Sequence, residues 1–149
     1  MRVKEKIYNK LLEIVESKIN LAKVSLDAAI DSRNNETKSS AGDKYETGRE
    51  MIQLEINKLE NQLIISESLK NELFKVNINR IHTTVDFGSL VTCNSGTYFI
   101  SIGIGRVNID SQDYYCISLA SPIGELLHNK KVGDSFEFNG RKFLIENIV

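Results

Sequence analysis

Two long stretches without proline constrain this chain more than any other feature of its sequence. Residues 3–31 contain neither glycine nor proline, and residues 43–75 contain a single glycine, Gly48. In both stretches apolar side chains recur at steps of three and four residues, which is the spacing of one face of an α-helix. About 30 residues at a rise of 1.5 Å per residue give a helix about 45 Å long. The sequence therefore predicts two long helices in its first half.

The apolar rows of these predicted helices indicate how they pack. The first helix has a row that polar Lys18 and Ser25 interrupt, formed by Ile7, Leu11, Ile14, Leu21 and Ala28. An unbroken row lies beside it, formed by Leu12, Val15, Ile19, Ala22 and Leu26. The second helix carries a heptad seam, formed by Ile52, Ile56, Leu59, Leu63, Ser66, Leu69 or Lys70, and Leu73. Such helices joined by a short polar segment predict an antiparallel coiled-coil hairpin over residues 1–75, with its tip near residues 33–46. Arms that form a compact bundle or dimerise are the alternatives.

The second half of the chain, residues 76–149, follows a different pattern. Short runs rich in β-branched and aromatic residues alternate with turn residues, which is typical of strands. Five strands are predicted, at residues 89–93, 97–103, 114–119, 135–138 and 141–148. Turns are predicted at residues 94–96, 110–113, 133–134 and 139–140. Asn139-Gly140 favours a tight hairpin, because both residues tolerate the positive φ angles of a type I′ turn.

One short helix is predicted between the third and fourth strands, over residues 123–129. Ser121 is a favourable N-cap, and Pro122 suits the first helical position. Residues 74–87 would link this half to the hairpin. The expected fold class is α+β: an N-terminal antiparallel coiled-coil hairpin, then a domain made of a mostly antiparallel sheet and one short helix.

Composition argues against several classes of protein. A net charge of −1 gives no general attraction for nucleic acid or for an anionic membrane. No apolar run approaches the roughly 20 residues that a membrane span needs. The charged N-terminus is unlike a signal peptide, so a cytoplasmic protein without membrane contact is expected. Cys93 and Cys116 lack the spacing of a metal site and are predicted to pack as small hydrophobic side chains.

No catalytic constellation stands out in the sequence. His82 and His128 have no neighbouring nucleophile or ligand pattern, and no catalytic role is expected for either. The glycines at Gly103 and Gly105 do not open a helix, so they form no nucleotide-binding fingerprint and predict close packing or a bulge in the sheet. With no tryptophan and 7% aromatic residues, an aromatic-lined isomerase pocket is not expected either.

Charged side chains at the hairpin tip are the remaining candidates. They are Glu36, Lys38, Asp43, Lys44, Tyr45, Glu46 and Arg49. Asp43 directly precedes the second helix, where the exposed N–H groups favour a carboxylate. It is either a helix cap or one carboxylate of a metal site completed by a partner, because Mg²⁺ usually takes one or two carboxylates plus waters and phosphates. Lys44 and Arg49 suit a phosphate or an acidic protein equally well.

Several short motifs occur in an informative order. In the second half they are residues 85–91 (VDFGSLV), 115–118 (YCIS), 121–127 (SPIGELL) and 131–134 (KVGD). Tyr45 and Arg49-Glu50 follow the tip in the first half. In these motifs and their order the sequence resembles the GreA/GreB family of bacterial transcript cleavage factors, over nearly the whole chain. The resemblance implies a C-terminal FKBP-like domain, residues 76–149, that docks at the rim of the RNA polymerase secondary channel. Ser121, Pro122 and Ile123 are the expected docking residues.

The resemblance also implies a role for the tip. The coiled coil would reach toward the catalytic Mg²⁺ of the polymerase, where tip carboxylates of cleavage factors stabilise a second Mg²⁺ and a water. The polymerase is then the enzyme, and the factor binds no cofactor alone. Anchored on Tyr45 and Arg49-Glu50, the family's two acid positions fall on Lys38 and Ala41, which offer no metal ligand.

The expected function is therefore that of a Gre-type factor that binds core RNA polymerase and regulates elongation. Stimulation of RNA cleavage would require Glu36 or Asp43, each two positions from a family acid position, to supply the carboxylate instead. The alternatives are a channel-binding regulator or inhibitor without cleavage, an FKBP-like isomerase or chaperone module, and a coiled coil that merely dimerises. A monomer is expected, in indirect contact with nascent RNA and DNA through the polymerase.

Overall fold

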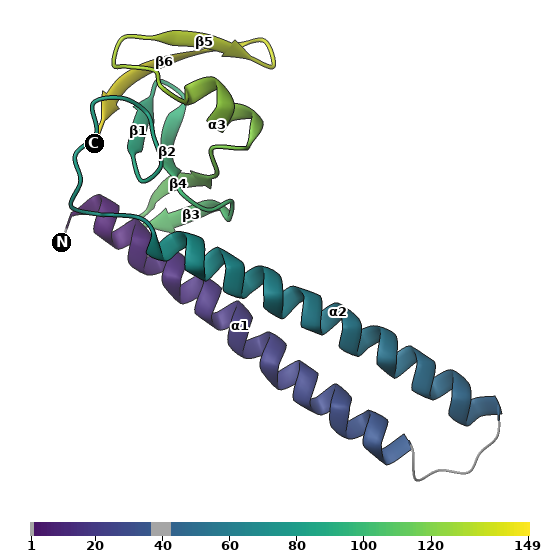
Figure 1. The fold of residues 1–149 in the computed structure, drawn as a ribbon. Coiled ribbons are helices and arrows are strands. Elements are labelled where there is room, and N and C mark those ends of the chain that lie inside the picture. The colour runs from purple at the N-terminus through teal and green to yellow at the C-terminus, as the bar shows by residue number, and fades with distance from the viewer. Residues whose placement is uncertain (1, 37–42) are drawn as a thin grey trace. The chain divides into compact units, whose positions relative to one another are not determined.

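The computed structural model describes residues 2–36 and 43–149, and the side chains of residues 2–35 and 46–149. It contains the hairpin predicted from the sequence. Helix α1 (Val3–Glu36) and helix α2 (Asp43–Phe74) run antiparallel (Figure 1). With 34 and 32 residues, each is about 50 Å long. Arg33 Nη1 donates to Gln53 Oε1 at 3.2 Å, and Lys70 Nζ lies 3.4 Å from Glu16 Oε1. Both contacts fit the same antiparallel alignment of α1 with α2.

The chain divides into two compact units. Unit 1 consists of Met1–Leu12 and Asn71–Val149, and unit 2 consists of Glu13–Lys70. The first turns of α1 and the last residues of α2 therefore belong to the same unit as the sheet. The predicted domain boundary between residues 75 and 76 stays a prediction.

Burial along the helices follows the predicted seam. The buried side chains of α2 include Ile56, Leu59, Ser66 and Leu73. On α1 the buried apolar residues are Ile7, Leu11, Val15, Ile19 and Ala22. The far half of the interrupted row is not buried, since Leu21 is 68% exposed. Lys18 and Ser25 break that row on either side of Leu21, so packing continues on the unbroken row instead.

Within the described residues, six strands form one sheet in the order β3-β4-β2-β1-β6-β5. In chain order they are β1 (Leu90–Cys93), β2 (Gly96–Ile100), β3 (Gly105–Ile109), β4 (Gln112–Ile117), β5 (Ser135–Phe138) and β6 (Arg141–Ile148). The short helix α3 (Pro122–Leu127) follows β4. The predicted mostly antiparallel sheet is confirmed, although β2 and β4 pair in parallel. Strand β3 was not predicted.

Two tight turns lie where the sequence predicts turns, and the one at Asn139-Gly140 confirms the predicted hairpin. Asp110 and Ser111 between β3 and β4 have φ angles of 52° and 66°, and Asn139 and Gly140 between β5 and β6 have 52° and 76°. Positive φ at both central residues is the type I′ geometry. By contrast, the close packing predicted for the glycines before β3 is wrong. A Cβ at Gly103 or Gly105 would meet nothing within 4 Å. Gly105 instead takes a φ of +96°, with which the chain enters β3.

The two faces of the sheet carry different side chains because residues alternate along each strand. Val91, Tyr98, Ile100 and Ile145 belong to one buried cluster, together with Leu127 of α3. Phe99 and Cys116 pair across β2 and β4 on the other face, and both are fully buried.

Both cysteines are free and buried, as predicted. Burial raises the pKa of the Cys93 thiol to about 11 and that of Cys116 to about 12. Both thiols therefore stay protonated near neutral pH and behave as small apolar side chains.

Candidate functional site

The hairpin tip is described only in part. Glu36, Lys38, Asp43, Lys44 and Tyr45 lie outside the residues whose side chains are described. Glu46 and Arg49 are exposed near the start of α2, three positions apart, so they lie on one side of the helix. Among the described residues, no group of three or more His, Cys, Asp or Glu side chains could hold a metal ion. The metal role of Asp43 stays a prediction.

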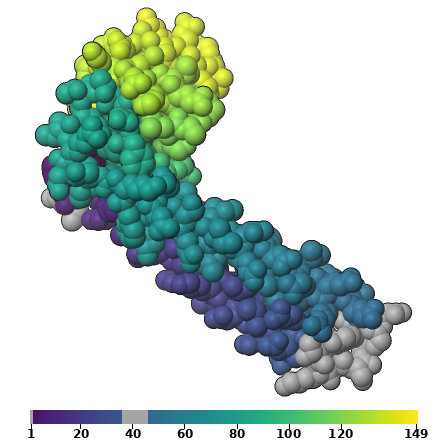
Figure 2. Space-filling model, viewed as in Figure 1, coloured from purple at the N-terminus to yellow at the C-terminus, as the bar shows by residue number. Residues whose placement is uncertain are grey.

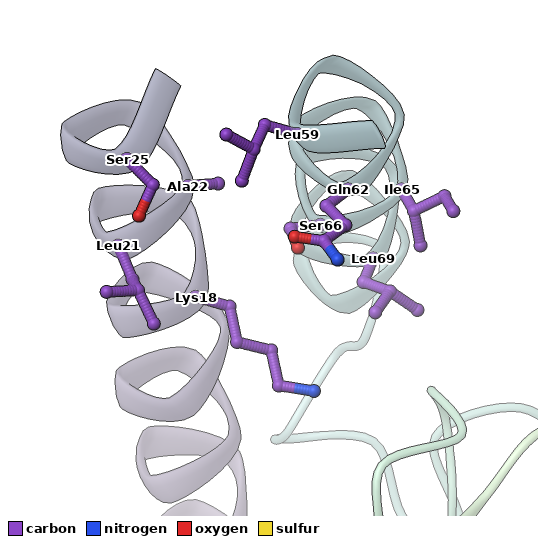
Figure 3. Close-up of a pocket in the computed structure, with 9 residues that line it drawn as sticks. All are labelled: Lys18, Leu21, Ala22, Ser25, Leu59, Gln62, Ile65, Ser66 and Leu69. Carbon is purple, nitrogen blue, oxygen red and sulfur yellow. The ribbon is translucent and has the colours of Figure 1, made fainter. Parts of the chain in front are cut away.

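The seam between α1 and α2 contains a hollow of about 430 Å³ in unit 2 (Figure 3). Ala22 and Leu59 point toward each other at one end, whereas Ile65 extends from the side of α2 away from α1. Small side chains border the hollow because Ser66 occupies a heptad core position and Ser25 faces it from α1. The two helices lie side by side along this unit in the ribbon and in the space-filling view (Figure 2). The hollow is an open groove along the seam, since Leu21 and Ile65 at its border are 68% and 61% exposed.

Filling this hollow is expected to stabilise the hairpin. Leucine at position 66 would continue the heptad seam and bury a large apolar side chain, so Ser66→Leu should raise the free energy of unfolding by about 1–2 kcal/mol. Urea denaturation followed by circular dichroism at 222 nm measures the change. Ser68→Leu, the same replacement at an exposed position of α2, is the matched control and should leave stability nearly unchanged. Equal effects of the two replacements would contradict the seam assignment.

The three predicted docking residues lie together at the start of α3. Ser121 caps the helix: its Oγ accepts from the Gly124 N–H at 3.1 Å and donates to the Ser118 carbonyl at 2.7 Å. Pro122 occupies the first helical position and is exposed. Ile123 is half-buried and reaches a hollow in the sheet unit. The sequence signals for this helix are thereby confirmed, while the docking role is a separate prediction.

We call this second cavity the aromatic hollow. Its volume is about 500 Å³, and it is lined by Ser95, Tyr98, Tyr115, Ile117, Ile123, Phe138, Asn139, Arg141 and Phe143. The rings of Tyr98 and Tyr115 stack at 5.4 Å, and Phe143 lies 6.3 Å from Tyr98. Burial raises the pKa of the Tyr98 hydroxyl, which is hydrogen-bonded to Ser95. The hollow is suited to an apolar side chain of a ligand or partner. Arg141 is the charged residue of its lining.

The aromatic hollow corrects an expectation drawn from composition. A low aromatic content predicted no aromatic-lined pocket, yet four rings line this one. They come from β2, β4, β5 and β6, which are separated in the sequence. Alternation along each strand was readable from the sequence, but it does not place the rings together. Tyr98 and Tyr115 face the same side because β2 and β4 pair in parallel, and the structure alone shows that pairing.

Neither histidine lines the aromatic hollow. His82 is buried, and its Nε2 has no hydrogen-bond partner among the described residues. Burial lowers the pKa of His82, and the charges of Lys4 and Arg80 lower it further, so the ring is neutral at pH 7. His128 Nε2 lies 3.6 Å from Asp86 Oδ1 at the end of α3.

No protein-family model matches the chain, and no curated protein matches it significantly. A solved structure of the transcription factor Gfh1 matches with a TM-score of 0.40 and 19% sequence identity, covering 92% of each chain. These values establish neither a shared family nor a shared function. None of the described helices is long and apolar enough to cross a membrane.

Proposed function

We propose that this protein is a Gre-type transcription factor, which binds core RNA polymerase at the secondary channel and regulates elongation. One observation carries the proposal. A helical hairpin with arms of 34 and 32 residues occurs in the same chain as a sheet that carries an aromatic hollow, which Ile123 of α3 helps to line. The motifs that resemble the GreA/GreB family occur in this same order along the sequence.

The sheet unit would make the docking contact. Ile123 and the rings of Tyr98, Tyr115 and Phe143 offer an apolar pocket to a side chain of the polymerase. Aromatic residues and arginine are enriched at the energetic centres of interfaces, and Arg141 borders this pocket. The polymerase would therefore present an apolar anchor to the hollow, and Ser121 and Pro122 would form part of the rim.

The hairpin tip would act within the channel. Glu46 and Arg49 offer one anionic and one cationic contact on the same side of α2. If the factor stimulates cleavage, a tip carboxylate would assist the Mg²⁺ of the polymerase, which remains the catalyst. In that role the protein binds no cofactor alone, contacts nascent RNA and DNA only inside the complex, and is a monomer in solution.

Binding to core RNA polymerase tests the proposal. The full-length chain should co-purify with core polymerase, and Ile123→Asp should weaken the complex by about 30-fold, because a charge would enter a desolvated apolar contact. Leu144→Asp makes the same change at an exposed position of β6 that does not line the hollow, and is expected to bind as the parent does. Failure of the parent protein to bind, or equal weakening by both variants, would contradict the proposal.

Cleavage and other regulation are separated by a second assay. Stalled, backtracked elongation complexes are incubated with the parent protein and with Asp43→Ala. Faster RNA cleavage that the replacement abolishes favours a metal-assisting carboxylate at position 43. Altered elongation without faster cleavage favours a regulator or inhibitor.

The aromatic hollow favours one second candidate, an FKBP-like isomerase or peptide-holding module. Four aromatic rings around a cavity of about 500 Å³ would accept a proline side chain. Turnover of a proline-containing peptide by the full-length chain is the decisive measurement. Catalysis that Tyr115→Ala removes would favour this candidate, and no turnover would exclude the isomerase.

A further inference from the structure

A second groove in unit 1 is distinct from the aromatic hollow. It has a volume of about 430 Å³ and lies between the start of α1, residues 78–81 and the strands β1, β2 and β4. Tyr114 lines this groove while its neighbour Tyr115 lines the aromatic hollow. Because successive strand residues face opposite sides, the two cavities lie on opposite faces of the sheet.

Three cations border this groove, and no Asp or Glu side chain lines it, although Val149, the last residue of the printed sequence, does line it. Lys4 is only 4% exposed, and its Nζ donates to the Arg80 carbonyl oxygen at 3.0 Å. Arg2 Nη2 donates to the Asn79 side-chain oxygen at 2.8 Å. Burial lowers the pKa of Lys4, and the nearby charges of Arg2 and Arg80 lower it further, so the three cations lie close enough to repel one another. Lys6, one turn away from the groove residues, is by contrast paired with Asp110 at 2.7 Å.

Apolar side chains lie beside these cations. Ile81 is 74% exposed, and Val3 is 41% exposed. Leu90 and Tyr114 are buried and line the groove. A buried ammonium group without a carboxylate partner is unfavourable, and an incoming anion would relieve that cost. Covering an exposed isoleucine with an apolar group is favourable, because apolar surface is removed from water. The groove is therefore complementary to a ligand that is both acidic and apolar.

We propose that this groove binds an acidic peptide segment of a partner protein. A glutamate or aspartate of the segment pairs with Arg2, Lys4 and Arg80. A neighbouring apolar side chain of the segment packs on Ile81, Leu90 and Tyr114. The volume suits one or two side chains of such a segment, and the cations set its orientation. This site is independent of the polymerase-docking surface and of the proposed function.

Amide chemical shifts of the ¹⁵N-labelled full-length protein test the proposal. The probe is a synthetic tetrapeptide, acetyl-Glu-Leu-Glu-Phe-amide, and its neutral counterpart is acetyl-Gln-Leu-Gln-Phe-amide. The acidic peptide should cause saturable shifts at Thr92, Thr97 and Gln112, which line the groove. Its affinity should exceed that of the neutral peptide by about tenfold and should fall with added salt.

Two arginine replacements make the test specific. Arg80→Gln should weaken binding of the acidic peptide by about tenfold. Arg106→Gln removes an exposed cation of β3 that does not line the groove, and should leave the affinity unchanged. The dispersion of the amide spectrum reports whether each variant is folded. Equal affinity for both peptides, shifts around the aromatic hollow instead, or unchanged binding by Arg80→Gln would overturn the proposal. Binding of sodium octanoate in the groove without binding of the peptide would overturn it as well.

Discussion

A Gly124→Ala variant is expected to lose about 2–3 kcal/mol of the free energy of unfolding of the sheet unit. Gly124 is the third residue of α3, and its N–H donates to the Ser121 cap. A Cβ at this position would collide with the backbone carbonyl oxygen of Ser118 and lie 2.8 Å from Ser121 Oγ. Backbone cannot rotate away as a flexible side chain can. Within helices alanine normally stabilises relative to glycine by about 1 kcal/mol, so a loss here has the opposite sign from the helix propensity.

The same replacement should weaken polymerase binding, because α3 and its cap hold Ile123 at the aromatic hollow. Urea denaturation followed by near-ultraviolet circular dichroism reports on the tyrosines of the sheet. Gly103→Ala is the matched control: a Cβ at that position meets nothing within 4 Å, so a change within about 0.5 kcal/mol is expected. A Gly124→Ala protein as stable as the parent would show that the loop at residues 118–121 can move aside at little cost.

Features with a local physical cause could be predicted from the sequence. The heptad spacing of Ile56, Leu59 and Ser66 fixed the seam of α2, since each helical turn repeats the same geometry. The turn at Asn139-Gly140 and the cap at Ser121 were also predictable. In the turn and the cap the conformational preference belongs to two or three neighbouring residues, so no tertiary contact is needed to recognise it.

Features assembled from distant residues could not be predicted in the same way. Strand β3 is short, and only Val107 among its five residues is buried, so its apolar signal was weak. The parallel pairing of β2 with β4 depends on where β3 lies, because β3 occupies the outer edge beside β4.

Both cavities of the sheet unit have the same origin. The aromatic hollow combines rings from separate strands, and the cationic groove combines Arg2 and Lys4 with Arg80, more than seventy positions away. Each cavity matches its proposed ligand only because the fold brings these distant residues together. Composition reports how many aromatic and cationic residues a chain has, but not which of them gather on one face.

Shortening the hairpin by one heptad in each arm is expected to weaken the effect on elongation by about tenfold or more, while binding to core polymerase persists. Deleting residues 20–26 and 60–66 together removes about 10 Å from each helix and keeps the heptad phase. The deletions lie between the Glu16–Lys70 and Arg33–Gln53 contacts, so both partners of each contact remain. Affinity for core polymerase should stay within about twofold, because the aromatic hollow lies in the other unit.

The effect on elongation should fall by about tenfold or more, since a misplacement of even 1 Å can greatly weaken a positioned group. Transcript extension by purified polymerase measures it, with a full-length Lys23→Gln, Glu60→Gln variant as the control for sequence changes in the deleted segments. Loss of binding in the shortened protein would mean that docking is not confined to the sheet unit. A shortened protein with its full effect would mean that the tip does not act by reaching a fixed distance into the channel, and that the hairpin serves another purpose.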